Sequence, residues 1–423
     1  MRDVRSAAVG GPMRAYYADA GFDGERMLRG GVLVVVDGGR IAGVETGRFD
    51  LPAGVPVTRL AGSTVLPGLI DAHVHLCGDG GPDALARVPD QRPEERVRVV
   101  RAALAAHLRA GVTTVRDLGD HHWTVADRAT AGPRDGEPRL VVSGPPITSH
   151  GGHCWSMGGQ AQGRRELAAS VRERAGRRVD VVKVMVSGGS MTAGSNLLAL
   201  QYATPDLTEV VRLAHGVGLP VTAHAHSVES VRVCLAAGVD GIEHCTCMTE
   251  RGLEQPESLF DDLAAAGVAV CPTIGRGPGS APSAQATTLM AHTNYTVEGR
   301  LAQVGRLAAA GARLISGSDA GIHPGKPHGI LPWSVVELVT AGVAPAVALA
   351  SATSAAADAC GLGTTTGRLR AGLAADLLVV RGDPTVNIAD LTRAQRVVLR
   401  GREIARPGAD RAALSSEQRP GTS

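Results

Sequence analysis

The sequence lacks a strong excess of charge of either sign. Among its 423 residues, 43 are Lys or Arg and 41 are Asp or Glu, which gives a formal net charge of +2. Binding to nucleic acid or to an anionic membrane usually requires a clustered excess of positive charge. We therefore expect a small-molecule substrate as the partner, and neither a nucleic acid nor a membrane.

Long apolar runs and paired cysteines are also missing. The longest apolar run near the N-terminus covers residues 32–36, which is too short for the core of a signal peptide or for a membrane span. The seven cysteines are odd in number and scattered, which predicts reduced and mostly buried thiols. Both absences lead us to expect a cytoplasmic protein.

Lysine is nearly absent. Only two of the 43 basic residues are lysine, Lys183 and Lys326, and Lys183 lies inside the apolar run 181–186. Arginine can replace lysine as a positive charge, whereas only lysine offers an amine that is readily deprotonated or modified. A chemical role for Lys183 is therefore expected.

A repeated local pattern indicates the fold. A helical stretch ends near a glycine, about five mostly β-branched or small apolar residues follow, and a polar residue stands six positions after the glycine. The pattern begins at Gly111, Gly218, Gly238 and Gly267, and looser copies begin at residues 176 and 311. Glycine ends helices because it adopts left-handed backbone conformations, and the apolar run is typical of a buried parallel strand.

Two further apolar segments bring the number of expected strands to eight. Helical patterns separate them, for example at 93–110, 206–217, 228–237 and 297–310. Such a series predicts an α/β fold of the (β/α)8 TIM-like barrel type. An open doubly wound sheet is the alternative, which the lack of Gly-x-Gly-x-x-Gly after the first strand disfavours. The strands are expected near residues 66–73, 112–117, 139–143, 180–186, 220–224, 241–244, 268–273 and 313–318.

The two ends of the chain differ from the repeated units. Residues 30–66 and 366–405 alternate short strands with turns, including the hairpin signal Asp37-Gly38. Neither end is long enough for a core of its own. We therefore expect both ends, residues 1–66 and 361–406, to form one small β-sandwich domain beside a barrel of residues 67–360. The Arg-, Ser-, Pro- and Gly-rich residues 407–423 predict a disordered tail.

Six potential metal ligands stand at or near the ends of the expected strands. Reactive groups of such barrels lie at the C-terminal ends of the strands, and alternate residues of a strand face the same side. A single histidine at a strand end is often a packing residue, but the joint placement predicts a metal site. The candidates are His73, His75, Lys183, His224, His244 and Asp319.

Lys183 suits such a site only in a modified form. Burial beside divalent cations disfavours an ammonium group and should lower the pKa of the amine sharply. A neutral amine can add carbon dioxide, and the resulting carbamate offers oxygen ligands to two cations. The alternative is an unmodified lysine that reaches the barrel mouth or pairs with Asp319.

Taken together, six segments of the sequence resemble the amidohydrolase superfamily. The similarity covers roughly residues 30–405. It is greatest to the branch with imidazolonepropionase-related proteins, metal-dependent Xaa-Pro dipeptidases and ochratoxin-type amidases. The segments are TVLPGLIDAHVHL, DVVKVMVSGG, VTAHAHS, AGVDGIEHCT, ISGSDAG and GRLRAGLAADLLVVRGDP.

The resemblance implies a binuclear metal centre and a homo-oligomer. Of the two histidines in VTAHAHS, His224 matches the family's first histidine, which leaves His226 to face the substrate. Zinc is the expected metal, and Mn, Co or Fe suit the same ligands. By motif position, His73, His75 and Asp319 would hold the inner ion, His224 and His244 the outer ion, and the carbamate on Lys183 would bridge them.

The expected chemistry follows from two such ions. They share a hydroxide of lowered pKa that attacks a carbonyl polarised by one ion. Asp319 takes up the proton and passes it to the leaving nitrogen. His153, in SHGGHCW, and His226 are the candidates to stabilise the oxyanion and contact the substrate. Arg276 is a candidate to bind a substrate carboxylate through its guanidinium.

The sequence thus predicts a metal-dependent hydrolase that cleaves a C–N amide bond of a dipeptide, an N-acyl amino acid or a similar compound. Histidine at 226, where the dipeptidase-like branch often has tyrosine, argues against proline dipeptides. The alternatives are a hydrolase of cyclic amides or imidazolones, a deaminase and a non-catalytic relative. A deaminase of this superfamily usually has a glutamate directly after the fifth strand, and Glu229 stands farther along the chain.

Overall fold

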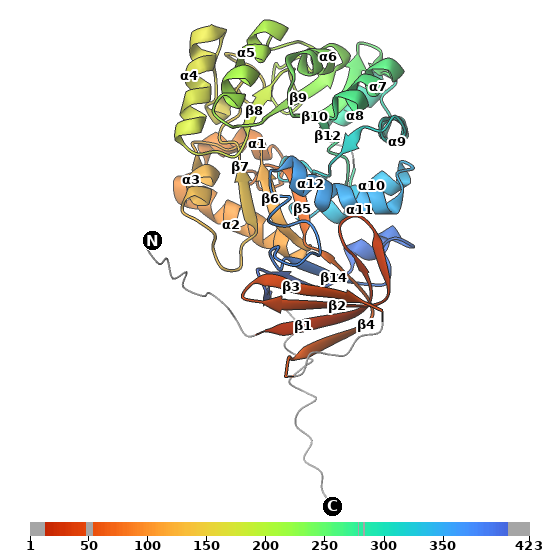
Figure 1. Ribbon diagram of the computed structural model, residues 1–423. Helices are drawn as coiled ribbons and strands as arrows, with labels where there is room; N and C mark the ends of the chain where they lie inside the picture. The colour runs from red at the N-terminus through yellow and green to blue at the C-terminus, as the bar shows by residue number, and fades with distance from the viewer. Residues whose placement is uncertain (1–12, 48–53, 278, 282–283, 405–423) are drawn as a thin grey trace, which may run out of the picture.

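The computed structural model describes residues 13–47, 54–277, 279–281 and 284–404. The tail expected at 407–423 and the first twelve residues lie outside these ranges. Figure 1 shows two parts, a barrel of alternating strands and helices and a β-rich domain to which both ends of the chain contribute. No helix within the described ranges is long and apolar enough to cross a membrane.

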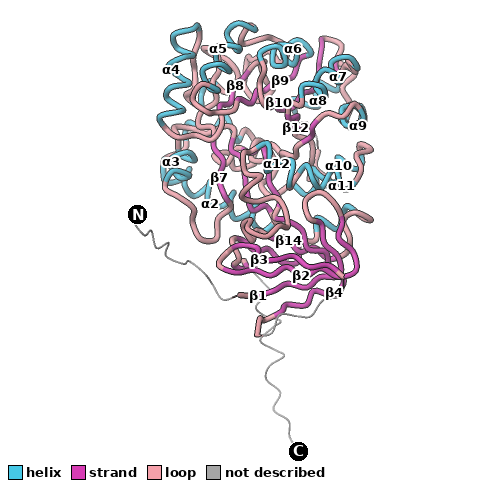
Figure 2. The backbone as a smooth tube through the Cα atoms, in the orientation of Figure 1, coloured by secondary structure: helices cyan, strands magenta, loops and turns pink. Residues whose placement is uncertain are grey.

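The β-rich domain joins the two ends of the chain, as expected. Its seven strands form one hydrogen-bonded order, β16-β15-β14-β4-β1-β2-β3, in which β14 from the C-terminal part pairs antiparallel with β4 from the N-terminal part. Figure 2 shows these strands gathered below the barrel. The strands are β1 (Arg14–Phe22), β2 (Met27–Asp37), β3 (Arg40–Thr46), β4 (Val57–Pro67), β14 (Leu377–Arg381), β15 (Ala394–Leu399) and β16 (Arg402–Glu403).

Alternation and turn chemistry explain this sheet. Val32, Val34 and Val36 alternate along β2 and belong to one buried apolar cluster of the domain, as expected for residues on one face of a strand, and Leu33 on the other face is buried as well. The predicted hairpin is present between β2 and β3. Gly38 and Gly39 both have positive φ, 53° and 82°, the conformation that a tight hairpin turn requires.

All eight expected barrel strands are present. They form two parallel runs, β5-β6-β7 and β13-β12-β10-β9-β8. Single parallel bridges between Ile147 and Val184 and between Val74 and Ala320 connect the two runs at both seams. The strands are β5 (Leu69–Val74), β6 (Val112–Asp117), β7 (Arg139–Val142), β8 (Val182–Met185), β9 (Val221–Ser227), β10 (Gly241–Thr249), β12 (Ala269–Cys271) and β13 (Arg313–Leu314). A short strand, β11 (Gly252–Leu253), adds to β10.

Helices follow the strands and surround them, which gives the TIM-like arrangement (Figure 1). The glycines of the repeated pattern end the preceding helical segments with positive φ, for example 76° at Gly238 and 64° at Gly267. The helices are α1 (Ala84–Arg87), α2 (Pro93–Arg109), α3 (Thr124–Thr130), α4 (Gly163–Gly176), α5 (Thr204–His215), α6 (Val228–Ala237), α7 (Glu257–Ala266), α8 (Ala284–His292), α9 (Val297–Ala309), α10 (Leu331–Thr340), α11 (Pro345–Ser351) and α12 (Ser354–Ala359).

Candidate metal centre

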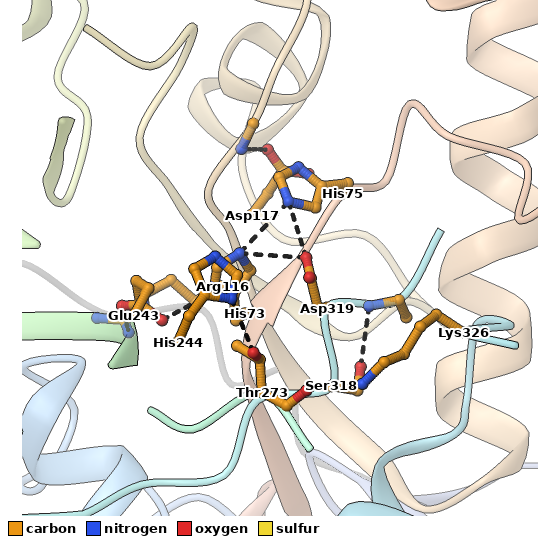
Figure 3. Close-up of polar contacts among 12 residues, drawn as sticks. His73, His75, Arg116, Asp117, Glu243, His244, Thr273, Ser318, Asp319 and Lys326 are labelled. Carbon is orange, nitrogen blue, oxygen red and sulfur yellow. Dashed lines mark hydrogen bonds and ion pairs between the residues drawn. The ribbon is translucent and has the colours of Figure 1, made fainter. Parts of the chain in front are cut away.

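His73, His75 and Asp319 converge at one end of the barrel. His73 and His75 come from the end of β5, and Asp319 follows β13. The Nε2 atoms of the two histidines are 3.3 Å apart, and Asp319 Oδ1 lies 3.4 Å and 3.1 Å from them. Figure 3 shows the three side chains pointing toward one another. Two imidazoles and a carboxylate at this spacing can hold one divalent cation.

A second group consists of three histidines. His224 and His226 lie on β9 and His244 lies on β10, and their potential ligand atoms all fall within 4.8 Å of one another. The ring centroids of His224 lie 4.5 Å from those of His226 and His244. His226 therefore lies beside His224 and His244, the two residues that the sequence predicts as ligands of the outer ion. The choice of His224 over His226 as the ligand stays a prediction.

Lys183 lines the same cavity as both groups. This cavity has a volume of about 110 Å³, and the Lys183 side chain is 1% exposed. Its Nζ has no hydrogen-bond partner among the described residues, and burial lowers the pKa of the amine. A buried amine of lowered pKa with no partner among the described residues, beside six imidazole and carboxylate donors, fits a site for divalent cations in which a carbamate on this lysine would add oxygen ligands.

Polar side chains contact the Nδ1 atoms of four histidines around the cavity, whereas His224 Nε2 faces the Gly188 carbonyl oxygen and His75 Nδ1 has no partner among the described residues. Such contacts fix the orientation and the tautomer of a ring that binds a metal through its other nitrogen. His73 Nδ1 lies 2.7 Å from Glu243 Oε2. The other three Nδ1 atoms each lie 2.8 Å from a threonine Oγ1: that of His226 from Thr246, that of His244 from Thr273, and that of His153 from Thr192.

The hydrogen bonds around the threonines assign the tautomer of His226 and are compatible with a different tautomer of His153. The Thr246 hydroxyl donates to the His226 carbonyl oxygen at 3.0 Å, so it accepts from His226 Nδ1 and leaves a lone pair on Nε2. The Thr192 hydroxyl already accepts from the backbone N–H of Cys154 at 2.9 Å. Its own hydrogen is free to donate to His153 Nδ1, and in that arrangement His153 carries its N–H on Nε2.

Burial keeps these histidines neutral. It lowers the pKa of His73 to about 4 and the pKa of His153 and His226 to about 3. Burial alone would raise the pKa of Asp319, but the nearby His73 and His75 outweigh it and hold the pKa of this carboxyl well below its usual range. Neutral imidazoles and an ionised carboxylate are the protonation states that a cation site needs.

Glu243 is a functional residue that the sequence reasoning missed. Its carboxylate accepts from Arg116 Nη2 at 2.8 Å and from Thr222 Oγ1 at 2.6 Å, besides facing His73. Burial raises the pKa of Glu243, but Arg116 and His73 outweigh it and keep the carboxylate ionised. The available signal was a charged residue inside each of two buried strands, Arg116 in β6 and Glu243 in β10.

His153 lies where the sequence predicts a substrate contact. It is 5% exposed, lines the cavity of the metal ligands, and its ring centroid is 4.8 Å from that of His224. Gly189 permits this position, because a Cβ there would lie 2.3 Å from His153 Nε2. The backbone N–H of His153 donates to Gln201 Oε1 at 2.6 Å, which ties its loop to the segment after β8.

Arg276 lies in a neighbouring cavity rather than beside His153. This second cavity has a volume of about 200 Å³ and shares His226, His244 and Asp319 with the first. Arg276 Nε is 3.8 Å from Glu337 Oε1, and the Arg276 side chain is 31% exposed. Glu229 stands in the first turn of α6 and is not among the residues that line either cavity.

Comparisons with known proteins agree with this geometry. The amidohydrolase family matches residues 64–404. Ochratoxinase of Aspergillus niger is 26% identical over 399 residues, covering 86% of this chain and 80% of that protein. A crystal structure of a Xaa-Pro dipeptidase with bound methionine in the active site is 24% identical, with a TM-score of 0.79, and covers 93% of this chain and 100% of that one. A prolidase complexed with N-methylphosphonate-L-proline is 24% identical, also with a TM-score of 0.79, and covers 94% and 100%. Both solved structures share the fold.

Proposed function

Because this chain belongs to the amidohydrolase family and is a metal-dependent hydrolase acting on C–N bonds, we propose that its substrate is a small amino-acid-derived amide, such as a dipeptide or an N-acyl amino acid. One observation carries the proposal. Two groups of potential metal ligands line one cavity at a barrel mouth together with the amine of Lys183, which has no hydrogen-bond partner among the described residues. The similarity to an ochratoxinase and to a Xaa-Pro dipeptidase supports the substrate class.

In this proposal the metal ligands are those predicted from the sequence. His73, His75 and Asp319 would hold one ion, His224 and His244 would hold the other, and a carbamate on Lys183 would supply further oxygen ligands. Zinc suits these donors, as do Mn, Co and Fe. When bound, the two ions supply Lewis acidity to the scissile carbonyl and lower the pKa of the attacking water.

Asp319 is the proposed proton carrier. Its backbone N–H donates to the His73 carbonyl oxygen at 2.8 Å, which fixes the residue against β5, and its φ of 58° is a left-handed conformation held by this environment. The neighbouring histidines keep its pKa low and the carboxylate ionised. In this proposal the ionised carboxylate accepts a proton from the attacking water. The same group then delivers the proton to the leaving nitrogen.

His153 is the proposed donor to the developing oxyanion. In this proposal Thr192 donates to its Nδ1, so that Nε2 carries the N–H, and this atom belongs to a side chain that lines the cavity. A neutral imidazole fixed in this way donates without reorganisation, the property that makes such donors effective. His226, with a lone pair on Nε2, instead suits an N–H group of the substrate.

The test is amine release from L,L-dipeptides, N-acyl-L-amino acids and cyclic amides by as-purified, chelator-treated and metal-restored protein. We expect hydrolysis of a dipeptide or an N-acyl amino acid that the chelator abolishes and metal restores. The variant Asp319→Asn, of the same shape, should lose about 10²- to 10⁴-fold in kcat. Turnover of cyclic amides alone would contradict the proposed substrate class, and turnover that survives complete metal removal would contradict the mechanism.

A further inference from the structure

Lys326, the other lysine of the chain, also lies at the site. It is 8% exposed and stands in the loop between β13 and α10. It lines the second cavity together with His244 and Asp319. In Figure 3 the Lys326 side chain lies on the Thr273 side of Asp319, whereas His75 lies on the other side. A chain that uses arginine almost everywhere thus places both of its lysines in the walls of two adjoining cavities.

The Lys326 ammonium has unused hydrogen-bonding capacity. Its Nζ donates to the Thr273 carbonyl oxygen at 2.7 Å, and two of its three N–H donors remain. Within the described parts of the chain, no carboxylate lies within ion-pair distance of this ammonium. A buried cation without a direct counter-ion costs several kcal/mol in folding. An anionic ligand in the cavity would supply the missing partner.

The carboxylates whose charges act on Lys326 already have other partners. Asp319, Glu337 and Asp71 act on Lys326 only at longer range. Asp319 faces the two histidines of β5, Glu337 accepts from the Gly275 N–H at 2.7 Å, and Asp71 accepts from the Ser318 N–H at 2.9 Å. The two donors left on Lys326 are therefore available to a group from outside the chain.

The rest of the cavity combines an apolar wall with a second cation. Ile274, Met290, Leu301 and Ile322 supply apolar surface, and Arg276 contributes a partly exposed guanidinium, whose Nε lies 3.8 Å from Glu337 Oε1 in the same cavity. A carboxylate has two oxygens, which match the two free donors of a lysine, and an apolar side chain matches the wall. This combination suits an amino acid with a free carboxylate more closely than a neutral amide.

We propose that Lys326 binds the free carboxylate of the substrate, with Arg276 as a second cation, so that the enzyme selects amides of apolar amino acids whose α-carboxylate is free. This inference rests on the proposed function, since it assigns the substrate class of the same site. It makes Lys326 a specificity-determining residue that is distinct from the metal ligands.

The test compares substrates that differ only in this charge. N-acetyl-L-phenylalanine and N-acetyl-L-methionine are assayed against their carboxamides with metal-loaded wild type, Lys326→Met and Lys326→Arg. We expect the ratio of kcat/KM for acid over carboxamide to fall by about 10- to 100-fold in Lys326→Met, mainly through KM, and to be partly retained in Lys326→Arg. Arg313→Gln, which removes an exposed positive charge on β13, is the matched control and should leave the ratio unchanged.

A binding measurement keeps the inference testable without turnover. Calorimetric titration with L-phenylalanine and with L-phenylalaninamide should show tighter binding of the acid to wild type, and Lys326→Met should lose that preference. Equal binding of acid and amide to wild type, or an unchanged preference in a folded Lys326→Met protein, would overturn the carboxylate assignment. Loss of metal content and of all hydrolysis would instead count against the proposed function.

Discussion

At the scale of single residues, the buried amine of Lys183 is the group that most needs a chemical explanation. Its amine is buried and, among the described residues, has no hydrogen-bond partner. Burying a polar group without a partner costs free energy that the fold must recover elsewhere. A carbamate would convert this amine into a metal-bound anion and remove the cost, which is why the modification belongs to the proposed centre.

The modification can be detected directly. Growth or incubation with ¹³C-labelled bicarbonate should give a carbamate carbon signal by NMR in wild type and not in Lys183→Met. The variant should also lose more than about 100-fold in activity, beyond the loss expected for a residue that only orients a ligand. Lys326→Met is the matched control and should retain the signal. A labelled wild type without the signal, but with full activity, would contradict the carbamate.

His107 tests the electrostatic account away from the metal ligands. It is fully buried on α2, its Nε2 lies 3.2 Å from His328 Nδ1, and its Nδ1 lies 3.8 Å from Asp71 Oδ2. Burial, and then the neighbouring His328, lower the pKa of His107 well below 6.5. The unfolded chain therefore binds a proton at His107 near pH 6.5, whereas the folded chain does not. The contribution of His107 to the free energy of unfolding is accordingly present above that pH and is lost below it.

The expected size follows from the unfolded pKa of about 6.5. Between pH 7.5 and pH 5.5, this residue should remove about 1.4 kcal/mol from the free energy of unfolding. His107→Gln should lose less stability than wild type over the same interval, as measured by urea unfolding of metal-free protein. Equal losses in the two proteins would show that His107 is already protonated in the folded state.

At the scale of elements, the buried Arg116–Glu243 pair joins the two runs of barrel strands. Arg116 on β6 reaches Glu243 on β10 and the Ala72 carbonyl oxygen on β5, at 2.8 Å and 2.7 Å. Glu243 in turn holds His73. Through these contacts the ion pair connects β5, which carries His73, to β10, which carries His244 (Figure 3).

Removing one partner of this pair should be costly. Glu243→Gln leaves the Arg116 charge buried without its counter-ion, and we expect a loss of about 3–5 kcal/mol in the free energy of unfolding. The double variant Arg116→Met/Glu243→Leu should be destabilised by less than the sum of Arg116→Met alone and Glu243→Leu alone, because no lone charge remains. Strict additivity in urea unfolding would contradict a direct role for the pair.

Gln201 connects two loops to the end of β8. Its Oε1 accepts from the His153 N–H at 2.6 Å, and its Nε2 donates to the Met185 and Ser187 carbonyl oxygens at 2.7 Å and 3.1 Å. A single amide thus fixes the donor loop relative to the lysine strand. The carboxamide is needed at both ends, since one atom accepts and the other donates.

Gln201→Leu should displace His153 and lower kcat by about 10-fold, less than the 10²- to 10³-fold expected for losing an oxyanion donor outright. Gln201→Glu keeps the acceptor and should lie between wild type and Gln201→Leu. In a His153→Ala background, Gln201→Leu should add little, because the group that it positions is already absent. A full additional loss in the double variant would show that Gln201 acts in another way.

The sequence predicts the elements better than the contacts between them. The eight strands and the ligands at their ends follow from local signals, namely a helix-ending glycine, a β-branched run and a polar residue at a fixed offset. The Arg116–Glu243 pair spans 127 residues and the Gln201–His153 bond spans 48. Such partners depend on strand order and loop path, so a local pattern cannot identify them.

At the scale of the whole molecule, the β-rich domain supports the strand that carries His73 and His75. Strand β4 runs through Gly68 directly into β5, and the Gly68 N–H donates to the Asp376 carbonyl oxygen at 2.8 Å. A Cβ at residue 68 would lie 2.2 Å from Thr113 Oγ1, so glycine permits this close junction. The two ends of the chain thereby fix one side of the metal centre.

The whole chain should also be stabilised by the ions it binds. A ligand that binds only the folded state raises stability by RT ln(1 + [L]/Kd), about 4 kcal/mol at 1,000 times Kd. Chelation should therefore lower the melting temperature by several degrees, and addition of Zn²⁺ or Mn²⁺ should restore it. A melting temperature that does not respond to chelator or metal would argue against a cation site in the core of the barrel.

The most direct test measures divalent-metal content and amine release from a dipeptide and an N-acyl amino acid panel in the same samples before chelation, after chelation and after metal restoration. The account predicts two ions per chain and hydrolysis of at least one panel member that falls and recovers with the metal content. A folded protein that binds no divalent metal under any of these conditions would contradict the account.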